Sequence, residues 1–299
     1  MRLGIHVPLE FFTATQAVQT AQDVEAAGLN HVLVNDHLRL PRGSHIIEAW
    51  TVLAAIASVT TRIRLGPSVT PLPLRHPYLL AKMAATIDQL SMGRLMMGVG
   101  AGWHPEEFTW METAFLPHSK RLAQTKEAIQ LIQNYWTESS TTFHGSYYSA
   151  DNVKLEPKPV QNPYPPFFLG GGSKEILELT ATYGQGWMPF APSISGLTRR
   201  VKELDTLLSS KNRMLKELEI IPSILLQFGE SSKKAHQRLI KWVTPSSENR
   251  AILGTPDDCL QQIVEYHKAG ATHLTLRLVN PDESRKTIQI IAQEILPNL

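Results

Sequence analysis

The sequence predicts an α/β fold of the TIM (β/α)8 barrel class, in which eight parallel strands alternate with helices. Eight short runs rich in Val, Ile and Leu alternate with longer segments whose apolar residues recur at helical spacing. This alternation indicates a parallel sheet. A chain of 299 residues suits eight such units, which take ~250 residues plus insertions. No G-x-G-x-x-G motif follows the first strand, which argues against a Rossmann domain.

The expected elements follow one another regularly along the chain. The strands are RLGIHV (2–7), HVLVN (31–35), RIRLGPSV (62–69), RLMMGVG (94–100), PFFLGG (166–171), GWMPF (186–190), EIIPSILLQF (219–228) and HLTLRL (273–278). The clearest helical patterns cover 13–28, 48–61, 78–93 and 121–136. Helix signals also stand at three glycine and proline positions, a stop at Gly93 and starts at Pro77 and Pro256.

Two segments interrupt the alternation and are expected to be insertions into a single domain that spans 1–299. Residues 137–165 predict a β-hairpin that turns at His144-Gly145, followed by a proline-rich stretch. The second segment is the polar stretch at about 228–256.

Composition narrows the possible partners and location. The net charge is +2 without a long basic run, which argues against a nucleic-acid partner. No stretch approaches the ~20 apolar residues of a membrane helix, and the N-terminus lacks the apolar core of a signal peptide. We therefore expect a cytoplasmic protein that does not bind membranes. The single cysteine, Cys259, is expected to be a buried apolar residue.

Polar residues at the ends of the strands predict where the site lies, because the loops after barrel strands form one open face. These residues are His6, the run Asn35-Asp36-His37, Ser68-Val69-Thr70, the segment GVGAGWH at 98–104 and GGGS at 170–173. The glycines before a helix start near Lys174 can present N–H groups to a phosphate, although a tight turn explains them equally well. His37 beside Asp36 is either a general acid or base or a structural hydrogen-bonding group.

Metal and nucleophile chemistry have weaker candidates. No H-x-H closes the first strand, and the other histidines lack ligand spacing, so a metal-dependent barrel hydrolase is only a third hypothesis and no metal is predicted. No G-x-S-x-G elbow is present, and Cys259 lies outside the expected open face.

Several segments, taken in order, resemble the bacterial luciferase-like family of flavin- or deazaflavin-dependent oxidoreductases. They are NDHL (35–38), EAWTVLAAIASVTTRIRLG (48–66), the long segment from Val69 to Phe108, PKPVQNPYPPFFLGGGS (157–173), GQGW (184–187) and LGTPDDCLQQIVEYHKAGATHL (253–274). The Asp-His pair is most similar to the branch that uses coenzyme F420, an 8-hydroxy-5-deazaflavin. The resemblance thus implies hydride transfer to or from a small organic substrate, with F420 as cofactor and a homodimer as the assembly.

The resemblance also assigns roles to individual residues. It implies that His37 moves the proton and that Asp36 contacts the deazaflavin ring. It places a non-prolyl cis peptide at Ser68-Val69 against the ring, and the backbone of Gly98, Gly100 and Ala101 close to it. Gly171, Gly172 and Ser173 match the phosphate site. We expect His6, Trp103 and His104 to line the substrate pocket.

Two other functions remain open from the sequence. With FMN in the same pocket, the protein would be a monooxygenase that uses reduced flavin and oxygen. FMN and F420 would use the same phosphate site, so that site does not distinguish the two cofactors. A barrel of this kind can also keep the pocket and lose turnover, which would leave a non-catalytic flavin-binding protein.

Overall fold

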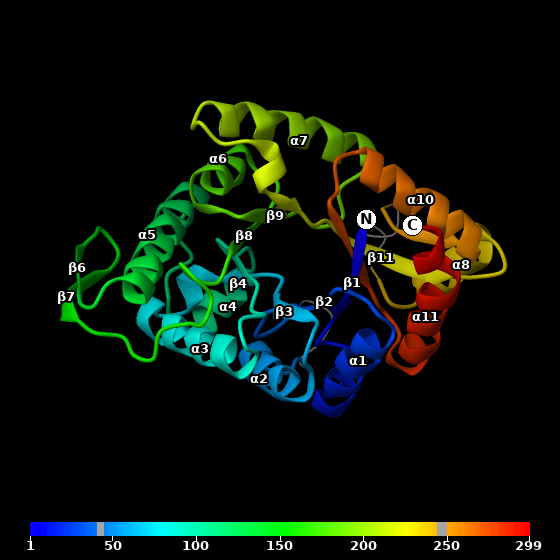
Figure 1. Cartoon of the computed structure of the whole chain (residues 1–299), viewed down its shortest axis with the longest axis horizontal. Coiled ribbons are helices and arrows are strands. Elements are labelled where there is room, and N and C mark those ends of the chain that lie inside the picture. The colour runs from blue at the N-terminus through cyan, green and yellow to red at the C-terminus, as the bar shows by residue number, and fades with distance from the viewer. Residues whose placement is uncertain (41–44, 244–249) are drawn as a thin grey trace.

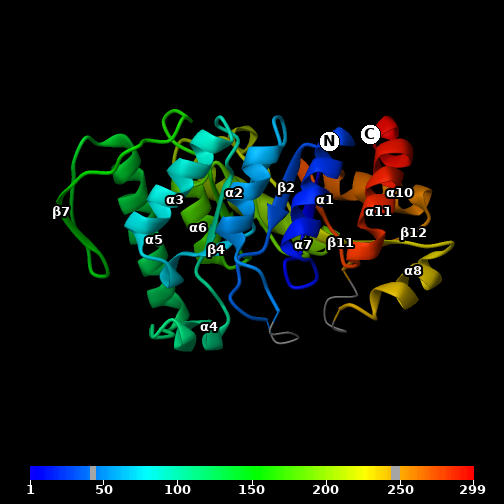
Figure 2. The same cartoon turned by 90° about the horizontal axis from the view of Figure 1, so that it is seen from below.

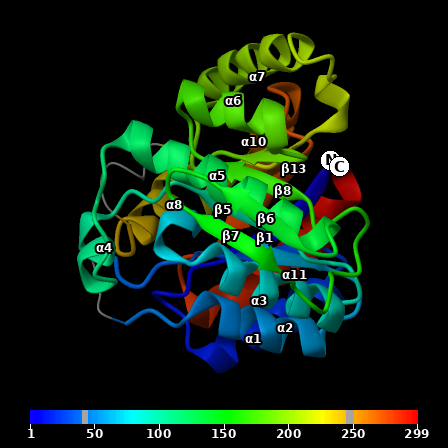
Figure 3. The same cartoon turned by 90° about the vertical axis from the view of Figure 1, so that its left-hand side faces the viewer.

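Parallel strands lie at the centre of the molecule and helices surround them (Figure 1). The computed structural model describes residues 1–40, 45–243 and 250–299. The N- and C-termini lie near each other in all three views (Figures 1, 2 and 3). Eight of the strands correspond to the eight expected from the sequence.

The strands of the ring are short, and each is followed by a helix or a loop. They are β1 (Arg2–Val7), β2 (His31–Val34), β3 (Arg64–Pro67), β5 (Met97–Gly100), β8 (Phe167–Gly170), β9 (Gly186–Met188), β11 (Ser223–Phe228) and β13 (His273–Arg277). Three further strands extend or flank them: β4 (Thr70–Pro71), β10 (Glu219–Ile220) and β12 (Ile252–Gly254).

The hydrogen-bonded ladders form two parallel sheets. One has the order β12-β11-β13-β1-β2-β3 and the other the order β10-β9-β8-β5-β4. Two isolated parallel bridges join their edges, between Leu65 and Leu95 and between Phe190 and Ser223. The eight ring strands therefore follow one another in a circle. Each seam between the two sheets has one isolated bridge beside the short pairing of β4 with β5 or of β10 with β9.

The described helices are α1 (Ala14–Ala26), α2 (Ala49–Val59), α3 (Pro77–Leu90), α4 (Pro105–Trp110), α5 (His118–Thr137), α6 (Lys174–Tyr183), α7 (Ile194–Ser209), α8 (Ser232–Leu239), α10 (Pro256–Lys268) and α11 (Ser284–Ile290). Most of them begin next to a capping side chain, whereas α4, α5 and α11 do not. Thr13 and Thr255 each form a capping box at the start of α1 and α10. The predicted helix starts at Pro77 and Pro256 are confirmed, and Gly93 follows α3 with φ +81°.

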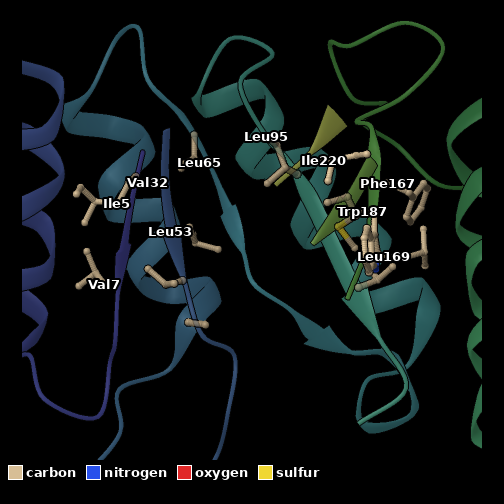
Figure 4. Close-up of a cluster of buried hydrophobic side chains, with 14 of the residues drawn as sticks. Ile5, Val7, Val32, Leu53, Leu65, Leu95, Phe167, Leu169, Trp187 and Ile220 are labelled. Atoms are coloured by element: carbon tan, nitrogen blue, oxygen red, sulfur yellow. The ribbon is translucent and has the colours of Figure 1, made fainter. Parts of the chain in front are cut away.

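The main hydrophobic core lies between the strands and the surrounding helices. Figure 4 shows part of it, with Ile5 and Val32 on the strands and Leu53 on α2. Cys259 belongs to this core and is fully buried, as predicted. A separate small cluster consists of Leu33, Met96, Phe168, Met188 and Ile221, with Val69 packed against it. All six come from ring strands or from the residues next to them.

The first expected insertion contains the predicted hairpin. Strands β6 (Thr141–His144) and β7 (Ser149–Val153) pair in antiparallel fashion, and the turn begins after His144. The hairpin lies on the outside of the molecule (Figure 3). There Glu127 of α5 accepts hydrogen bonds from the backbone N–H groups of Ser146 and Tyr147. The second insertion holds α8 and β12, and its residues 244–249 lie outside the described part of the chain.

Helices α4 and α8 project from the same end of the ring (Figure 2). Each belongs to a connection that leaves the carboxyl end of a ring strand, α4 after β5 and α8 after β11. The open face expected from the sequence is therefore at this end. None of the helices in the described ranges is long and apolar enough to cross a membrane.

Candidate functional site

A pocket of about 420 Å³ opens at the carboxyl ends of the ring strands. This volume is within the range of small-molecule and cofactor sites. Its walls come from β2, the β3–β4 connection, β5, α5, β8, β9, β11 and β13. A shallow depression open to solvent lies along α7, and all the residues that line it belong to that helix.

Most of the residues predicted from the sequence line the pocket. They are His37, Ser68, Val69, Gly100, Ala101, Trp103, Gly171, Gly172 and Ser173. The Ser68–Val69 peptide is cis, as the resemblance implies. Four predicted residues are not part of the lining, namely His6, Asp36, Gly98 and His104. Each of these four is buried behind the wall.

Asp36 is turned away from the pocket by strong hydrogen bonds. Its Oδ1 accepts from Nη2 of Arg75 at 2.6 Å, and its Oδ2 accepts from Nε of Arg75 at 3.1 Å. Oδ2 also accepts from the hydroxyl of Thr70 at 2.7 Å and from the indole N–H of Trp50 at 3.0 Å. Burial opposes the charge on Arg75, but Asp36 and Glu48 outweigh it and raise the pKa of Arg75. Asp36 thus joins β2 to α2 and to the segment that follows β3.

The glycines of β5 and β8 make room for other parts of the ring. A Cβ on Gly98 would lie 1.9 Å from the carbonyl oxygen of Pro67, so this glycine permits the close approach of β3 and β5. A Cβ on Gly100 would lie 2.8 Å from the Val69 side chain, and one on Gly170 2.6 Å from it. Real side chains do not approach so closely, and Val69 therefore occupies space that only glycines leave open.

His37 is held by a carboxylate that the sequence did not single out. Its Nδ1 lies 3.1 Å from both carboxylate oxygens of Glu107, which is 1% exposed. Glu107 also accepts from the backbone N–H of Leu38 at 2.6 Å and of Arg39 at 3.4 Å. Burial opposes ionisation, but these donors outweigh it and lower the pKa of Glu107.

An ionised carboxylate can only accept hydrogen bonds, so Nδ1 of His37 carries a hydrogen. In the neutral imidazole, Nε2 is then the nitrogen that can accept a proton. Trp103 packs edge-on against the same ring, with centroids 5.7 Å apart and planes at 78°. The imidazole is thus fixed in tautomer and orientation at the pocket wall.

The loop after β5 places Trp103 in the pocket and His104 behind it. The two rings stack at 5.2 Å with planes 14° apart. Trp103 is 57% exposed, whereas His104 is buried at 6%. Arg121 of α5 fixes the start of this loop by donating to the carbonyl oxygens of Ala101 and Gly102.

The GGGS segment has the geometry of an anion cradle. Gly171 adopts φ +118°, and nothing lies within 4 Å of a Cβ built on Gly172. Ser173 caps α6, and the indole N–H of Trp187 donates to the carbonyl oxygen of Gly171 at 2.7 Å. At the start of the ten-residue helix α6 the N–H of Ile176 donates to the Ser173 hydroxyl, while the helix dipole and the other N–H groups of the first turn favour a negatively charged group. The residues present therefore fit a cofactor phosphate.

Sequence reasoning missed several residues of the site. Glu107 stands within the segment GWHPEEF, but nothing in its spacing separates it from the exposed neighbour Glu106. Arg277 and Ser223 stand within apolar strand runs, Arg277 at the end of β13 and Ser223 at the start of β11, and only the barrel register brings them to the pocket. His118 and Phe190 line the pocket from the starts of α5 and of the loop after β9. Within the described ranges, no group of three or more His, Cys, Asp or Glu side chains is placed to hold a metal ion.

Relatives with known names include dehydrogenases and monooxygenases. An F420-dependent glucose-6-phosphate dehydrogenase of Nakamurella multipartita is 27% identical over 331 aligned positions, covering 100% of this chain and 96% of the relative. An FMNH(2)-dependent dimethylsulfone monooxygenase of Pseudomonas putida is 29% identical over 185 residues, 62% of this chain and 51% of that one.

A solved structure confirms the predicted fold class. An F420-dependent secondary alcohol dehydrogenase, bound to an F420-acetone adduct, superimposes with a TM-score of 0.89 and covers 99% of this chain and 98% of its own. Its identity to this chain is 20%. The model of the luciferase-like monooxygenase family matches residues 1–249, which is most of the sequence. The chain therefore belongs to the luciferase-like monooxygenase family.

Proposed function

We propose that the protein is an F420-dependent oxidoreductase that transfers a hydride to or from a small organic substrate. The observation that carries this proposal is the His37–Glu107 pair at the wall of a pocket that also contains the GGGS cradle. Relatives of both cofactor types are known, and the F420-dependent glucose-6-phosphate dehydrogenase aligns over the whole chain.

Individual residues of the pocket would have the following roles in cofactor binding and proton transfer. Gly171, Gly172 and Ser173 would hold the cofactor phosphate, and Ser68-Val69 would support the ring system. Bound F420 would supply a carbon centre that carries hydride. His37 would take the proton of a substrate hydroxyl on Nε2, or return it in the reverse direction. Glu107 would keep Nδ1 protonated and stabilise the charged imidazole.

Asp36 receives a different role from the ring contact that the resemblance implies. Its carboxylate is engaged by Arg75, Thr70 and Trp50. We assign Asp36 as a positioning residue that fixes the neighbouring His37 and the segment carrying Ser68 and Val69. Gly98 likewise has a structural role, because it allows β3 and β5 to pack closely. His6 and His104 would support the residues of the pocket wall from behind.

The second candidate is an FMN-dependent monooxygenase that uses reduced flavin and oxygen. The dimethylsulfone monooxygenase relative favours it, and an FMN phosphate would fit the same cradle. A non-catalytic flavin-binding protein is the third, and the intact His37–Glu107 pair counts against it. The homodimer and the cytoplasmic location stay predictions.

Titration of the purified protein with F420 and with FMN, followed by fluorescence quenching, tests the proposal. We expect F420 to bind more tightly than FMN, and reduced F420 to be oxidised when an acceptor substrate is supplied. Tight binding of FMN alone, with oxygen consumption by the reduced complex, would favour the second candidate. Binding without hydride exchange or oxygen use would favour the third.

A further inference from the structure

A second polar region of the pocket is formed by a group that we call the Arg277 cluster: His6, Glu10, Asn35, Ser223 and Arg277. Arg277, Ser223 and Asn35 line the pocket, and His6 lies behind them. Arg277 closes β13, three strands around the ring from the β8 strand that leads into GGGS. The cluster is therefore separate from the cofactor cradle.

The guanidinium of Arg277 is held rigidly. Its Nη2 donates to Oε1 of Glu10 at 2.6 Å, and its Nη1 lies 3.1 Å from Nε2 of His6. The side chain is only 13% exposed, and Cζ lies 5.6 Å from the centroid of the Phe190 ring. The hydrogen bonds from the described residues use two of its five N–H groups. The others remain for a ligand.

His6 leaves the hydroxyl hydrogen of Ser223 available to the pocket. An arginine has no acceptor, so Nε2 of His6 must accept the hydrogen bond from Arg277, and Nδ1 carries the hydrogen. Burial and the charge of Arg277 hold the pKa of His6 well below its usual value, which keeps the ring neutral. Nδ1 lies 3.5 Å from the Ser223 hydroxyl oxygen. The oxygen keeps a second lone pair, and its own hydrogen, which His6 does not use, can donate toward the pocket.

The carboxylate and amide acceptors of this cluster are engaged within the protein. Oε2 of Glu10 accepts from the side-chain amide of Asn35 at 3.0 Å, and Oδ1 of Asn35 accepts from the backbone N–H of Leu9 at 2.8 Å. The side of the cluster that lines the pocket is therefore rich in donors. A ligand that satisfies it must supply acceptors.

The lining itself contains no acidic side chain among the described residues, and Arg277 is its permanently charged group. The carboxylate of Glu10, which pairs with Arg277, lies outside the lining. The Phe190 ring lies against the guanidinium of Arg277, and Met188 and Pro189, which precede it in the chain, add apolar surface to the lining. The combination suits a small molecule with an anionic end and a hydrocarbon body.

We propose that Arg277, together with Ser223, binds the carboxylate or sulfonate group of a small organic anion and so selects the substrate. The planar guanidinium fork matches two oxygens of such a group. The apolar part of the substrate lies against Phe190 and Met188. This inference rests on the proposed function, because it names the substrate class of the same site.

Four probes of equal chain length test the inference: hexanoate, hexane-1-sulfonate, hexan-1-ol and hexylammonium. Their affinities are measured by calorimetry on the protein loaded with whichever cofactor binds. We expect one of the two anions to bind about tenfold or more tightly than the alcohol, as a charge-assisted hydrogen bond contributes. The anion that binds more tightly, hexanoate or hexane-1-sulfonate, identifies the head group that the site prefers. Hexylammonium should not bind.

The double variant Glu10→Gln/Arg277→Gln removes the charge pair as a whole and leaves no buried carboxylate without a partner. It should bind anion and alcohol within about twofold of each other, because the charge-assisted contact is lost, while cofactor affinity is retained. Arg285→Gln, on the exposed Arg285–Asp23 pair, is the matched control and should keep the preference. If the double variant does not fold, Arg277→Lys replaces it in the test. This variant should also reduce the preference for the anion over the alcohol, because lysine lacks the planar guanidinium that can bind two oxygens.

Alcohol binding as tight as anion binding, or a preference that survives the loss of Arg277, would overturn the inference. Absence of binding by every probe would do the same. A protein that binds neither F420 nor FMN would overturn the proposed function instead, and the probe series on the cofactor-free protein would still decide the anion site.

Discussion

The two carboxylate oxygens of Glu107 lie at the same distance, 3.1 Å, from Nδ1 of His37. The same carboxylate receives the backbone N–H groups of the two residues that follow His37. One buried side chain therefore fixes the imidazole, its tautomer and the loop that carries it. This relationship leads to the first prediction.

Replacing Glu107 by Gln should lower kcat by about tenfold to a hundredfold and leave the Kd of the cofactor nearly unchanged. An amide can present its NH2 group to Nδ1, which favours the wrong tautomer and no longer stabilises a charged imidazole. His37→Ala should lower kcat by about a hundredfold or more. Steady-state kinetics over pH 5–9 provide the measurement, and an unchanged pH profile in Glu107→Gln would refute the positioning role.

Asp36→Asn should reduce the free energy of unfolding by about 3 kcal/mol, because it breaks a buried ion pair and leaves Arg75 partly uncompensated. Glu48→Gln is the matched control on the same arginine. Its side chain is 40% exposed, and the change should cost less than about 1 kcal/mol. Chemical denaturation of both variants measures the difference. Equal losses in the free energy of unfolding would contradict the role of Asp36 in joining β2 to α2 and to the segment after β3.

Gly170→Ala should weaken cofactor binding by about tenfold, since the new methyl group would displace Val69 from its position under the pocket. The double variant Gly170→Ala/Val69→Ala should recover part of the loss by restoring space. Val69→Ala alone is the control for the loss of the valine side chain. Cofactor titrations of the three proteins give the answer, and a failure of the double variant to recover would point to another cause.

Stability should decline as the pH falls from about 6.5 toward 4, partly through His273. Burial lowers the pKa of this residue to about 4 in the folded protein, whereas an unfolded histidine titrates near ~6.5. Between these values the unfolded chain binds more protons, so acidification favours unfolding in this window. Denaturation curves at several pH values should show a smaller decline for His273→Asn than for the unchanged protein.

The Cys259 thiol should be inert toward Ellman's reagent at pH 8 until the protein unfolds. It is fully buried, and burial together with Asp258 raises its pKa to about 12. Because the thiolate is the reactive form, almost none is present in the native state. Release of one thionitrobenzoate per chain should occur only in denaturant, and rapid reaction of the native protein would show that this core region opens readily.

The sequence predicted the fold in some detail, because its signals are local. Capping threonines, Pro77 and Pro256 mark helix starts, and alternating strand and helix periods indicate the parallel ring. The glycine cradle and His37 were found because they stand at strand ends. The partners of these residues were harder to find. Glu107 lies 70 residues from His37, and Arg75 lies 39 residues from Asp36.

Two predicted residues show why a motif does not fix a role. Asp36 adjoins His37 in sequence, but successive residues point in different directions, and its carboxylate meets Arg75 rather than the pocket. Gly98 belongs to a glycine run after the fourth ring strand, yet its missing side chain serves the contact with Pro67. Only the register between neighbouring strands distinguishes such cases.

The two seams of the ring suggest how ligand binding affects the stability of the barrel. At each seam one isolated backbone bridge, Leu65 to Leu95 or Phe190 to Ser223, stands beside a short ladder, β4 with β5 or β10 with β9. The pocket is lined by residues of both sheets, so a bound molecule contacts both sheets at once. Binding must then raise the resistance of the whole ring to opening. Amide hydrogen exchange at the strand edges of both seams should slow in proportion to cofactor occupancy.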